Sequence, residues 1–234
     1  MRALLLAAGL GTRLRPITEN IPKCLVPIHS KPLLGYWFDL LLAKADVECL
    51  LVNTHYLPEP VKTFITTSSW KDRIEMVHEL ELLGTGGTVL RNAAFFKDQP
   101  FMVVHADNLS RFNVGEFIAS HRARALGCVM TMMLFNTDQP ESCGIVETDC
   151  RGVVVGFHEK VDNPPGNLAN GAVYIFEPEV IDFLHGLGKP IIDLSTEVLP
   201  NFIGRINTFI NTDYHRDIGT LESLRKAEAE FSAA

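Results

Sequence analysis

Short apolar runs alternate with helical patterns along the first half of the chain. The first run, residues 2–7, predicts a strand. A helix is predicted from Pro32, because the apolar side chains that follow recur on one helical face, at Leu33, Trp37, Leu40 and Leu41. Further strands are predicted at 48–54, 73–79 and 101–105, with helices at 58–68 and 86–95. This alternation is typical of a parallel sheet that helices cover on both faces.

The pattern changes after residue 128. Predicted strands now follow one another with little helix between them, at 128–135, 143–148, 153–159 and 171–176, which favours antiparallel additions to the sheet. Helices at 178–186 and 193–203, a strand at 205–211 and a charged amphipathic helix at 220–231 complete the prediction. The sequence therefore predicts an α/β fold with a Rossmann-like, mixed, mostly parallel central sheet flanked by helices. No repeat or linker interrupts it, so a single domain over residues 1–234 is expected.

Composition narrows the class of protein. Hydrophobic residues make up 47% of the chain and charged residues 21%, as in soluble globular proteins. The net charge of −7 argues against a general surface for nucleic acid or anionic membrane, which would need clustered Lys and Arg. The apolar run at Ala3–Leu10 contains Gly9 and is too short to span a bilayer, and the scattered cysteines form no Cys-x-x-Cys pair. We expect a cytoplasmic protein without a nucleic-acid or membrane partner.

A glycine-rich segment follows the first predicted strand, from Gly9 to Arg13. It leaves the carboxyl edge of the predicted sheet, which is where open α/β sheets bind ligands. Glycines let backbone N–H groups approach a phosphate closely, and a basic side chain beside them can pair with its oxygens. The segment does not fit the Rossmann fingerprint, which needs a third glycine where Leu14 stands, or the Walker pattern, which needs Gly-Lys-Ser/Thr.

Six ordered motifs together resemble one known family. Gly9-Leu10-Gly11-Thr12-Arg13 followed by Pro22-Lys23 is similar to the signature of the sugar-1-phosphate nucleotidyltransferases. Further matches follow in the family's order, at Leu83–Gly87, Ala106–Asn108, Glu159–Lys160, Asn170–Gly171 and Asp217–Thr220. The resemblance implies a fold of the nucleotide-diphospho-sugar transferase type. It is strongest to the short, catalytic-domain-only branch, including guanylyltransferases for mannose or heptose 1-phosphate.

This resemblance implies transfer of a nucleoside monophosphate from a nucleoside triphosphate to a sugar 1-phosphate, with Mg²⁺ as cofactor and pyrophosphate as second product. The attacking sugar phosphate is already an anion, so no catalytic base is needed. By the family match, Arg13 and Lys23 hold the triphosphate and join Asp107 as catalytic residues. Asp107 and Asp217 are the implied Mg²⁺ ligands, since Mg²⁺ favours carboxylates together with substrate phosphates. A purely capping role beside Thr220 is the alternative for Asp217.

The resemblance also assigns the substrate contacts. The nucleotide-binding residues are Ala7, Ala8, Gly9, Gly11, Thr12, Glu79, Gly84 and Thr85. Glu79 is expected to read the base, with Glu81 as its rival, whereas the glycines at 84–87 could serve only to begin the next helix. The residues that bind the sugar phosphate are Gly144, Glu159, Lys160 and Asn170. For Asn170 a tight turn at Asn-Gly is the alternative.

The identity of base and sugar rests on small differences. Leu83–Gly87 favours GTP and a mannose- or heptose-like sugar for cell-surface polysaccharide, whereas Ala7-Ala8-Gly9 is closer to uridylyltransferases of cell-wall sugar recycling. Uridylyl-, cytidylyl- and thymidylyltransferase therefore remain alternatives, and the sequence leaves a homo-oligomer open. A glycosyltransferase that uses a nucleotide sugar is favoured less. That class usually carries Asp-x-Asp, and the chain has Asp107-Asn108-Leu109. A non-catalytic subunit is disfavoured because the site residues are present.

Overall fold

The computed structural model describes residues 1–44 and 46–231. Its contacts divide the chain into two compact units, and each is described by itself. Unit 1 consists of Met1–Leu82, Val104–Phe112 and Asp213–Ala234, and unit 2 consists of Leu83–Val103 and Asn113–Thr212. The boundary falls inside strand β6 (Phe101–His105).

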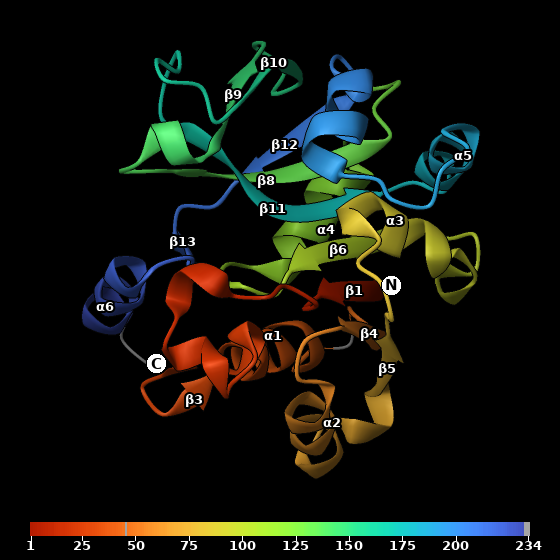
Figure 1. The fold of residues 1–234 in the computed structure, drawn as a ribbon. Coiled ribbons are helices and arrows are strands. Elements are labelled where there is room, and N and C mark those ends of the chain that lie inside the picture. The colour runs from red at the N-terminus through yellow and green to blue at the C-terminus, as the bar shows by residue number, and fades with distance from the viewer. Residues whose placement is uncertain (45, 232–234) are drawn as a thin grey trace. The chain divides into compact units, whose positions relative to one another are not determined.

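Unit 1 is built on three parallel strands, β1 (Arg2–Leu6), β4 (Cys49–Thr54) and β5 (Ile74–His78), with β4 between the other two. Helices α1 (Leu33–Leu42) and α2 (Pro58–Thr67) make the crossovers that parallel strands require (Figure 1). The apolar residues of α1 are buried except for Leu40, which is half-buried, and Trp37 Nε1–H donates to the carbonyl of Asn108 at 2.8 Å. The carboxyl ends of all three strands therefore meet at one edge.

A second part of unit 1 joins distant segments of the sequence. Strands β7 (Asn108–Arg111) and β13 (Tyr214–Asp217) pair as an antiparallel ribbon. Helix α6 (Leu221–Glu230) begins with a capping box between Thr220 and Ser223. Two short strands, β2 (Pro27–Ile28) and β3 (Lys31–Pro32), also pair with each other. One buried apolar cluster links these elements, and its members include Leu14, Leu33, Leu109, Ile218 and Phe231.

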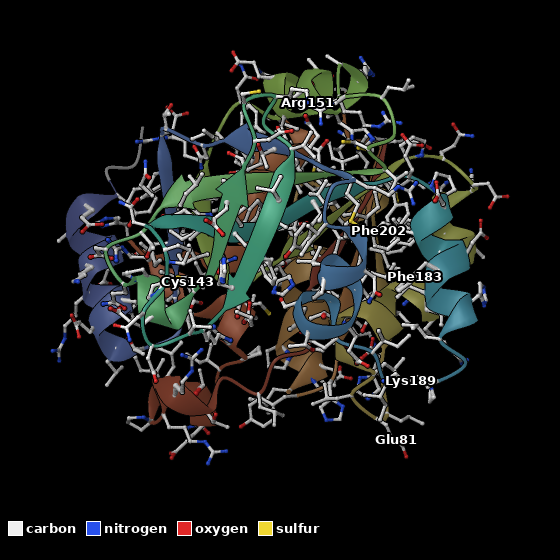
Figure 2. All side chains as sticks on the ribbon, turned by 90° about the horizontal axis from the view of Figure 1, so that it is seen from above. Glu81, Cys143, Arg151, Phe183, Lys189 and Phe202 are labelled. Atoms are coloured by element: carbon white, nitrogen blue, oxygen red, sulfur yellow. The ribbon has the colours of Figure 1, made fainter. Side chains whose placement is uncertain are left out.

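Unit 2 contains the strands β8 (Met130–Asn136), β9 (Gly144–Thr148), β10 (Val154–Glu159), β11 (Leu168–Phe176) and β12 (Ile206–Ile210). β11 pairs antiparallel with β8 and β9, β10 pairs antiparallel with β9, and β12 runs parallel to β8. Its helices are α3 (Gly84–Arg91), α4 (Val114–Arg122) and α5 (Glu179–Gly186). Phe183 of α5 contacts Phe202 edge to face, with ring centroids 5.0 Å apart (Figure 2).

The predicted fold class is confirmed: the fold is α/β, with a mixed sheet flanked by helices. The helix predicted at 193–203 is instead a π-helical turn at Leu194–Val198 followed by a 3₁₀ helix at Leu199–Phe202, where Pro200 lacks the N–H that an α-helix would need. The predicted helix at 86–95 begins at Gly84 and ends at Arg91, with a 3₁₀ turn after it. β7, β13 and α4 were not predicted.

Asn170 and Gly171 do not form a hairpin turn. They lie inside β11, where the pairing with β8 shifts register between Asn170 and Tyr174 and Ala172 has a positive φ of 51°. In the described part of the chain, no helix is long and apolar enough to cross a membrane.

Candidate active site

The glycine-rich loop, residues 7–13, leaves β1 at the carboxyl edge of unit 1 and is exposed at Gly9, Thr12 and Arg13. Gly11 has a positive φ of 64°, and a Cβ there would lie 3.0 Å from Thr18 and 3.1 Å from the Lys23 Cβ. A side chain at position 11 is therefore excluded by both backbone conformation and space. The Thr18 hydroxyl donates to the Gly11 carbonyl at 2.7 Å and holds the bend of the loop.

Lys23 lies at the start of a 3₁₀ helix, Lys23–Leu25, directly after Pro22. Its side chain is only 8% exposed, and its ammonium lies 2.6 Å from Asp107 Oδ2 and 3.5 Å from Asp217 Oδ1. Lys23 is therefore not a solvated surface lysine. The structure places this lysine between the two carboxylates that the sequence singled out.

Backbone pairing explains how Asp107 and Asp217 meet. The N–H of Ala106 donates to the Leu6 carbonyl at 3.0 Å, which sets Asp107 beside the start of the glycine-rich loop. Asp217 is the register partner of Asn108 in the β7–β13 ribbon, and the N–H of Ile218 donates to the Asp107 carbonyl at 3.1 Å. Asp217 and Asp107 both contact Lys23, and the cap of α6 is formed by Thr220 and Ser223, so the capping role for Asp217 is not needed.

Arg13 and Gly219 complete the cluster in unit 1. The Arg13 guanidinium lies 3.9 Å from Asp217 Oδ2 and is 68% exposed on its side chain, so it is accessible to a ligand. A Cβ at Gly219 would lie 2.6 Å from Asp217 Oδ2 and 2.9 Å from Arg13 Nη2. A side chain at position 219 would therefore displace the end of Asp217 or Arg13 from its present position.

The charges of the cluster shift its carboxyl groups in opposite directions. Burial is the largest single effect on Asp107 and favours its neutral form, but the charges of Lys23 and His105 and the hydrogen bonds to the carboxylate together outweigh it and lower the pKa of Asp107 below its ordinary value. Burial, supported by the charge of Asp107, raises the pKa of Asp217 despite Lys23 and Arg13. Burial lowers the pKa of the neighbouring His215 to about 3, so His215 is neutral at physiological pH. The positive charge of Lys23 is thus shared by two carboxylates, Asp107 and Asp217, that repel each other.

The candidate base-reading carboxylate, Glu79, follows β5 and is 5% exposed. Its Oε1 accepts from Asn53 Nδ2 at 3.0 Å, and Asn53 Oδ1 accepts from the N–H of Ala7 at 2.7 Å. Ala7 and Ala8 are both buried. Glu81, labelled in Figure 2, is exposed. These contacts favour Glu79 over Glu81 as the residue linked to the glycine-rich loop.

The glycines of α3 lie against a segment of unit 2 that the sequence did not single out. The N–H groups of Gly86 and Gly87 donate to the Ile192 carbonyl at 2.8 and 3.2 Å, and a Cβ at Gly84 would lie 2.5 Å from that oxygen. The Thr85 hydroxyl accepts from the N–H of Leu194 at 2.7 Å. The glycines are thus required for close packing at the start of α3, and a direct role in base reading stays a prediction.

The sugar-phosphate candidates gather around β9–β10 and β11 in unit 2. Gly144 is the register partner of Glu159, and a Cβ at Gly144 would lie 2.6 Å from Glu159 Oε2. The Lys160 ammonium lies 3.1 Å from Glu159 Oε1 and its side chain is 66% exposed. Asn170 Nδ2 donates to the buried Tyr174 hydroxyl at 2.7 Å. The structure thus brings Gly144, Glu159 and Lys160 together, with Asn170 on the strand next to β9.

Three residues near these groups escaped the sequence analysis: Asn53, Gly219 and Tyr174. Gly219 lies in the matched segment Asp217–Thr220, which could have drawn attention to it. Asn53 interrupts an apolar strand, a weak signal that a polar side chain is needed there. Tyr174 carries no sequence signal, because an aromatic residue in a buried strand is ordinary.

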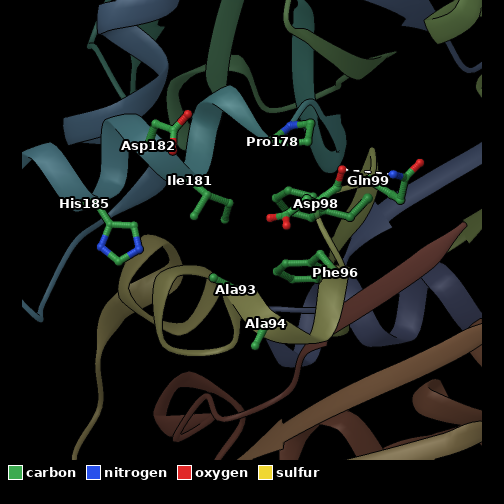
Figure 3. A pocket seen from close by; sticks show the side chains of 10 residues that line it. Ala93, Ala94, Phe96, Asp98, Gln99, Pro178, Ile181, Asp182 and His185 are labelled. Atoms are coloured by element: carbon green, nitrogen blue, oxygen red, sulfur yellow. Dashed lines mark hydrogen bonds between the residues drawn. The ribbon is translucent and has the colours of Figure 1, made fainter.

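A cavity of about 210 Å³ elsewhere in unit 2 contains none of the predicted site residues (Figure 3). Phe96, Phe101 and Ile181 line it, and its acidic side chains are Asp98 and Asp182. It contains no Lys or Arg. Such a cavity would repel a triphosphate, so it is not a candidate for the nucleotide site.

The donor set in unit 1 fits a divalent cation that also contacts substrate. Among the described residues, no three or more His, Cys, Asp or Glu side chains are grouped to hold a metal by themselves. Asp107 and Asp217 instead converge on one cation, Lys23. Mg²⁺ usually takes one or two protein carboxylates and completes its shell with water and phosphate oxygens, so two carboxylates suffice.

The chain belongs to the nucleotidyl transferase family, whose sequence model matches residues 2–233. It is 31% identical to a mannose-1-phosphate guanylyltransferase of Mycobacterium tuberculosis, covering 98% of this chain and 64% of that protein. It is 30% identical to a UTP–glucose-1-phosphate uridylyltransferase of Synechocystis, covering 97% of this chain and 62% of that protein. The chain therefore spans less than two thirds of the length of these two relatives.

Solved structures agree with the fold. HddC from Yersinia pseudotuberculosis, also solved in complex with GMP-PN, aligns with a TM-score of 0.81 at 25% identity and covers 99% of both chains. An apo UDP-glucose pyrophosphorylase aligns with a TM-score of 0.81 at 22% identity, covering 97% of this chain and 96% of that one. The second likeness concerns the fold alone.

Proposed function

We propose that the protein transfers a nucleoside monophosphate from a nucleoside triphosphate to a sugar 1-phosphate and releases pyrophosphate. The observation that carries this proposal is the cluster of Arg13, Lys23, Asp107 and Asp217 beside the glycine-rich loop. Two cations and two carboxylates at the carboxyl edge of a parallel sheet suit a metal-bound polyphosphate better than a neutral substrate. Membership of the nucleotidyl transferase family supports the same reaction.

The charge of each site residue indicates its proposed role in the reaction. A sugar 1-phosphate oxygen attacks the α-phosphorus, and the bond to pyrophosphate breaks in line. The nucleophile is already an anion, so the protein positions and stabilises charge and needs no base. Lys23 places a single positive charge near the α-phosphate, and the Arg13 guanidinium donates bidentate hydrogen bonds to phosphate oxygens. Asp107 and Asp217 hold Mg²⁺, which when bound offsets the negative charge of the triphosphate. Lys160 and Glu159 serve the phosphate and the hydroxyls of the sugar.

The reaction is tested by measuring pyrophosphate release with five nucleoside triphosphates against a panel of sugar 1-phosphates. We expect release only when both substrates are present, and a nucleotide sugar as the second product. In a second assay, a nucleotide sugar replaces these two substrates. Its consumption without pyrophosphate release would instead identify a glycosyltransferase. No product in either assay, from a folded chain, would contradict an enzymatic role.

GTP with mannose or heptose 1-phosphate is the favoured pair. Leu83–Gly87 and the Mycobacterium tuberculosis guanylyltransferase support GTP, whereas the Synechocystis uridylyltransferase supports UTP as the alternative. Glu79 is proposed to accept from the guanine edge. We expect GTP to have the highest kcat/KM and Glu79→Gln to reduce its advantage. Equal or better use of UTP, CTP or dTTP would refute the choice of GTP, and unchanged preference in Glu79→Gln would remove only the role of Glu79.

The metal assignment has its own test. Asp107→Asn and Asp217→Asn should each fold, yet need more Mg²⁺ for half-maximal turnover and reach a lower maximal rate, because each loses a charged ligand. Asp39→Asn is the matched control, since Asp39 is paired with Lys31 at 2.6 Å and takes no part in the cluster. Full activity of the wild type in EDTA, or a wild-type Mg²⁺ dependence in Asp217→Asn, would show the assignment to be wrong.

A further inference from the structure

Asn53 occupies a central position in unit 1. It lies near the carboxyl end of β4, the middle strand, and its register partners are Leu6 of β1 and Val77 of β5. The residue is 2% exposed. A side chain at this point can reach the residues that follow both neighbouring strands. Those residues are Ala7, where the glycine-rich loop begins, and Glu79, the proposed base-reading carboxylate.

The side chain of Asn53 uses both ends of its amide. Oδ1 accepts from the N–H of Ala7 at 2.7 Å, and Nδ2 donates to Glu79 Oε1 at 3.0 Å. The amide can point only one way, because its neighbour on one side is a donor and on the other an acceptor. Asp could accept from Ala7 but could not donate to Glu79. Leu, of similar size, could do neither.

The backbone around Glu79 is already fixed. Its N–H donates to the Thr54 carbonyl at 2.8 Å, and its carbonyl accepts from His55 Nδ1 at 2.8 Å. Asn53 contacts the carboxylate directly.

We propose that Asn53 is a positioning residue that locks the carboxylate of Glu79 to the first residue of the glycine-rich loop. Base recognition and placement of the triphosphate are then set by a single buried side chain. The inference rests on the proposed function, in which Glu79 reads the base and the loop holds phosphate. Groups that bind a ligand are effective only when neighbouring contacts fix their rotamers.

Two variants separate the two halves of the contact. Asn53→Asp keeps the acceptor for Ala7 but sets a second carboxylate against Glu79. The double variant Asn53→Asp with Glu79→Gln restores a hydrogen bond at the same place with its direction reversed, while the base-reading charge is gone. Asn201→Asp is the matched control, since the exposed Asn201 donates to the Glu197 carbonyl outside this network.

The measurements are kcat and KM for GTP and UTP, GTP affinity by calorimetry, and hydrogen exchange of the Ala7 amide. In Asn53→Asp we expect KM for GTP to rise about 10- to 100-fold, as for a buried polar group left mispaired, with kcat changed far less. The preference for GTP over UTP should fall while Ala7 stays protected. The double variant should lower the KM for GTP below that of Asn53→Asp, because the hydrogen bond is restored, without restoring the preference for GTP over UTP. A merely structural role would not produce this split.

Each outcome decides one claim. Wild-type KM and base preference in Asn53→Asp would overturn the inference while leaving the proposed reaction intact. A folded double variant no better than Asn53→Asp would overturn it as well. If the wild type releases no pyrophosphate but binds GTP, the reaction fails, and the inference is judged by whether Asn53→Asp weakens GTP binding and the double variant restores it. A wild type that does not bind any triphosphate would overturn both.

Discussion

Lys23 is a buried cation held by two carboxylates. Lys23→Ala removes the proposed contact to the α-phosphate and leaves Asp107 and Asp217 without their shared counter-charge. We expect kcat to fall about 100- to 1000-fold, the effect of losing one donor to a charged transition state. The rate is measured as pyrophosphate release at saturating substrates, and circular dichroism checks the fold.

Lys226→Ala is the control for Lys23→Ala. Lys226 pairs with Glu222 one turn away on α6, and such surface pairs contribute little. Its turnover should stay within about twofold of wild type. Near-normal turnover in a folded Lys23→Ala protein would remove Lys23 from the chemistry.

Gly219→Ala tests the space beside Arg13 and Asp217. The added methyl group meets the far ends of two partly exposed side chains, which can move aside at little cost in stability. Their displacement should nonetheless disturb phosphate and metal contacts, so we expect kcat/KM to fall at least about tenfold with a small change in Tm. Gly186→Ala is the control, because nothing lies within 4 Å of its Cβ position. Equal kcat/KM in the two variants would contradict the proposed role of Gly219.

At the level of residues, the sequence predicted a role for residues that belong to motifs of adjacent or nearby positions. Arg13 and Lys23 stand beside diagnostic glycine and proline residues, so their role could be predicted before their geometry was known. Asn53 contacts partners at positions 7 and 79, which directly follow two other strands. No local pattern encodes such a contact, since it depends on the order of strands in the sheet.

At the level of elements, the long apolar strands and most amphipathic helices were predicted to within a few residues, because periodicity defines them. The exceptions among the helices were α4, which was not predicted, and residues 193–203, which form no α-helix. The β7–β13 ribbon was not. Its strands read Asn-Leu-Ser-Arg and Tyr-His-Arg-Asp, too short and polar to show alternation, and each is stabilised by the other. The element that joins the two candidate metal ligands was therefore the one least visible in the sequence.

We expect the stability of unit 2 to depend on pH because of His121 in α4. Its Nδ1 lies 2.8 Å from the Thr131 hydroxyl and its Nε2 lies 3.1 Å from Glu177 Oε1. Burial, aided by the charge of Arg124, lowers the pKa of His121 from 6.5 to about 4 although Glu177 opposes the shift. Between these values the unfolded chain binds a proton that the folded chain does not. The contribution of neutral His121 to stability is therefore complete above pH 6.5 and is lost as pH falls toward 4.

This contribution amounts to at most about 3 kcal/mol. Urea unfolding at pH 7 and pH 5 should show the wild type losing more stability on acidification than His121→Gln, which has no group titrating at that position. His121→Gln will lower stability at both pH values by breaking the bond to Thr131. The measured quantity is therefore the difference between the two pH values, and an identical difference in both proteins would refute the assignment.

At the scale of the whole molecule, unit 1 is assembled from three separate stretches of sequence, and Phe231 contacts all of them. Its ring centroid lies 5.3 Å from that of Tyr36 and 5.1 Å from that of Tyr214, and the Arg111 guanidinium lies 5.2 Å from it. Tyr36 belongs to the first stretch, Arg111 to the second and Tyr214 to the third. Phe231 is 6% exposed.

Phe231→Ala should therefore lower the free energy of unfolding by about 3–5 kcal/mol, the usual effect of emptying a large buried aromatic site. Phe183→Ala is the control, because Phe183 is only partly buried and contacts Phe202 within unit 2. It should cost roughly 1–2 kcal/mol in the same urea titration. A Phe231→Ala variant no less stable than Phe183→Ala would show that the cluster does not hold the three stretches together.

The division of unit 1 along the chain also has a consequence in time. A ribosome makes the strands β1, β4 and β5 and the side chains of Arg13 and Lys23 early, and makes Asp217 and α6 only after all of unit 2. At about 5–20 residues per second, Lys23 waits on the order of ten seconds or more for its second carboxylate. In that interval Leu14, Val26 and Ile28 lack the apolar partners that the last stretch supplies. We expect nascent chains to need chaperone protection at this surface, and the charged cluster to form only when synthesis has passed α6.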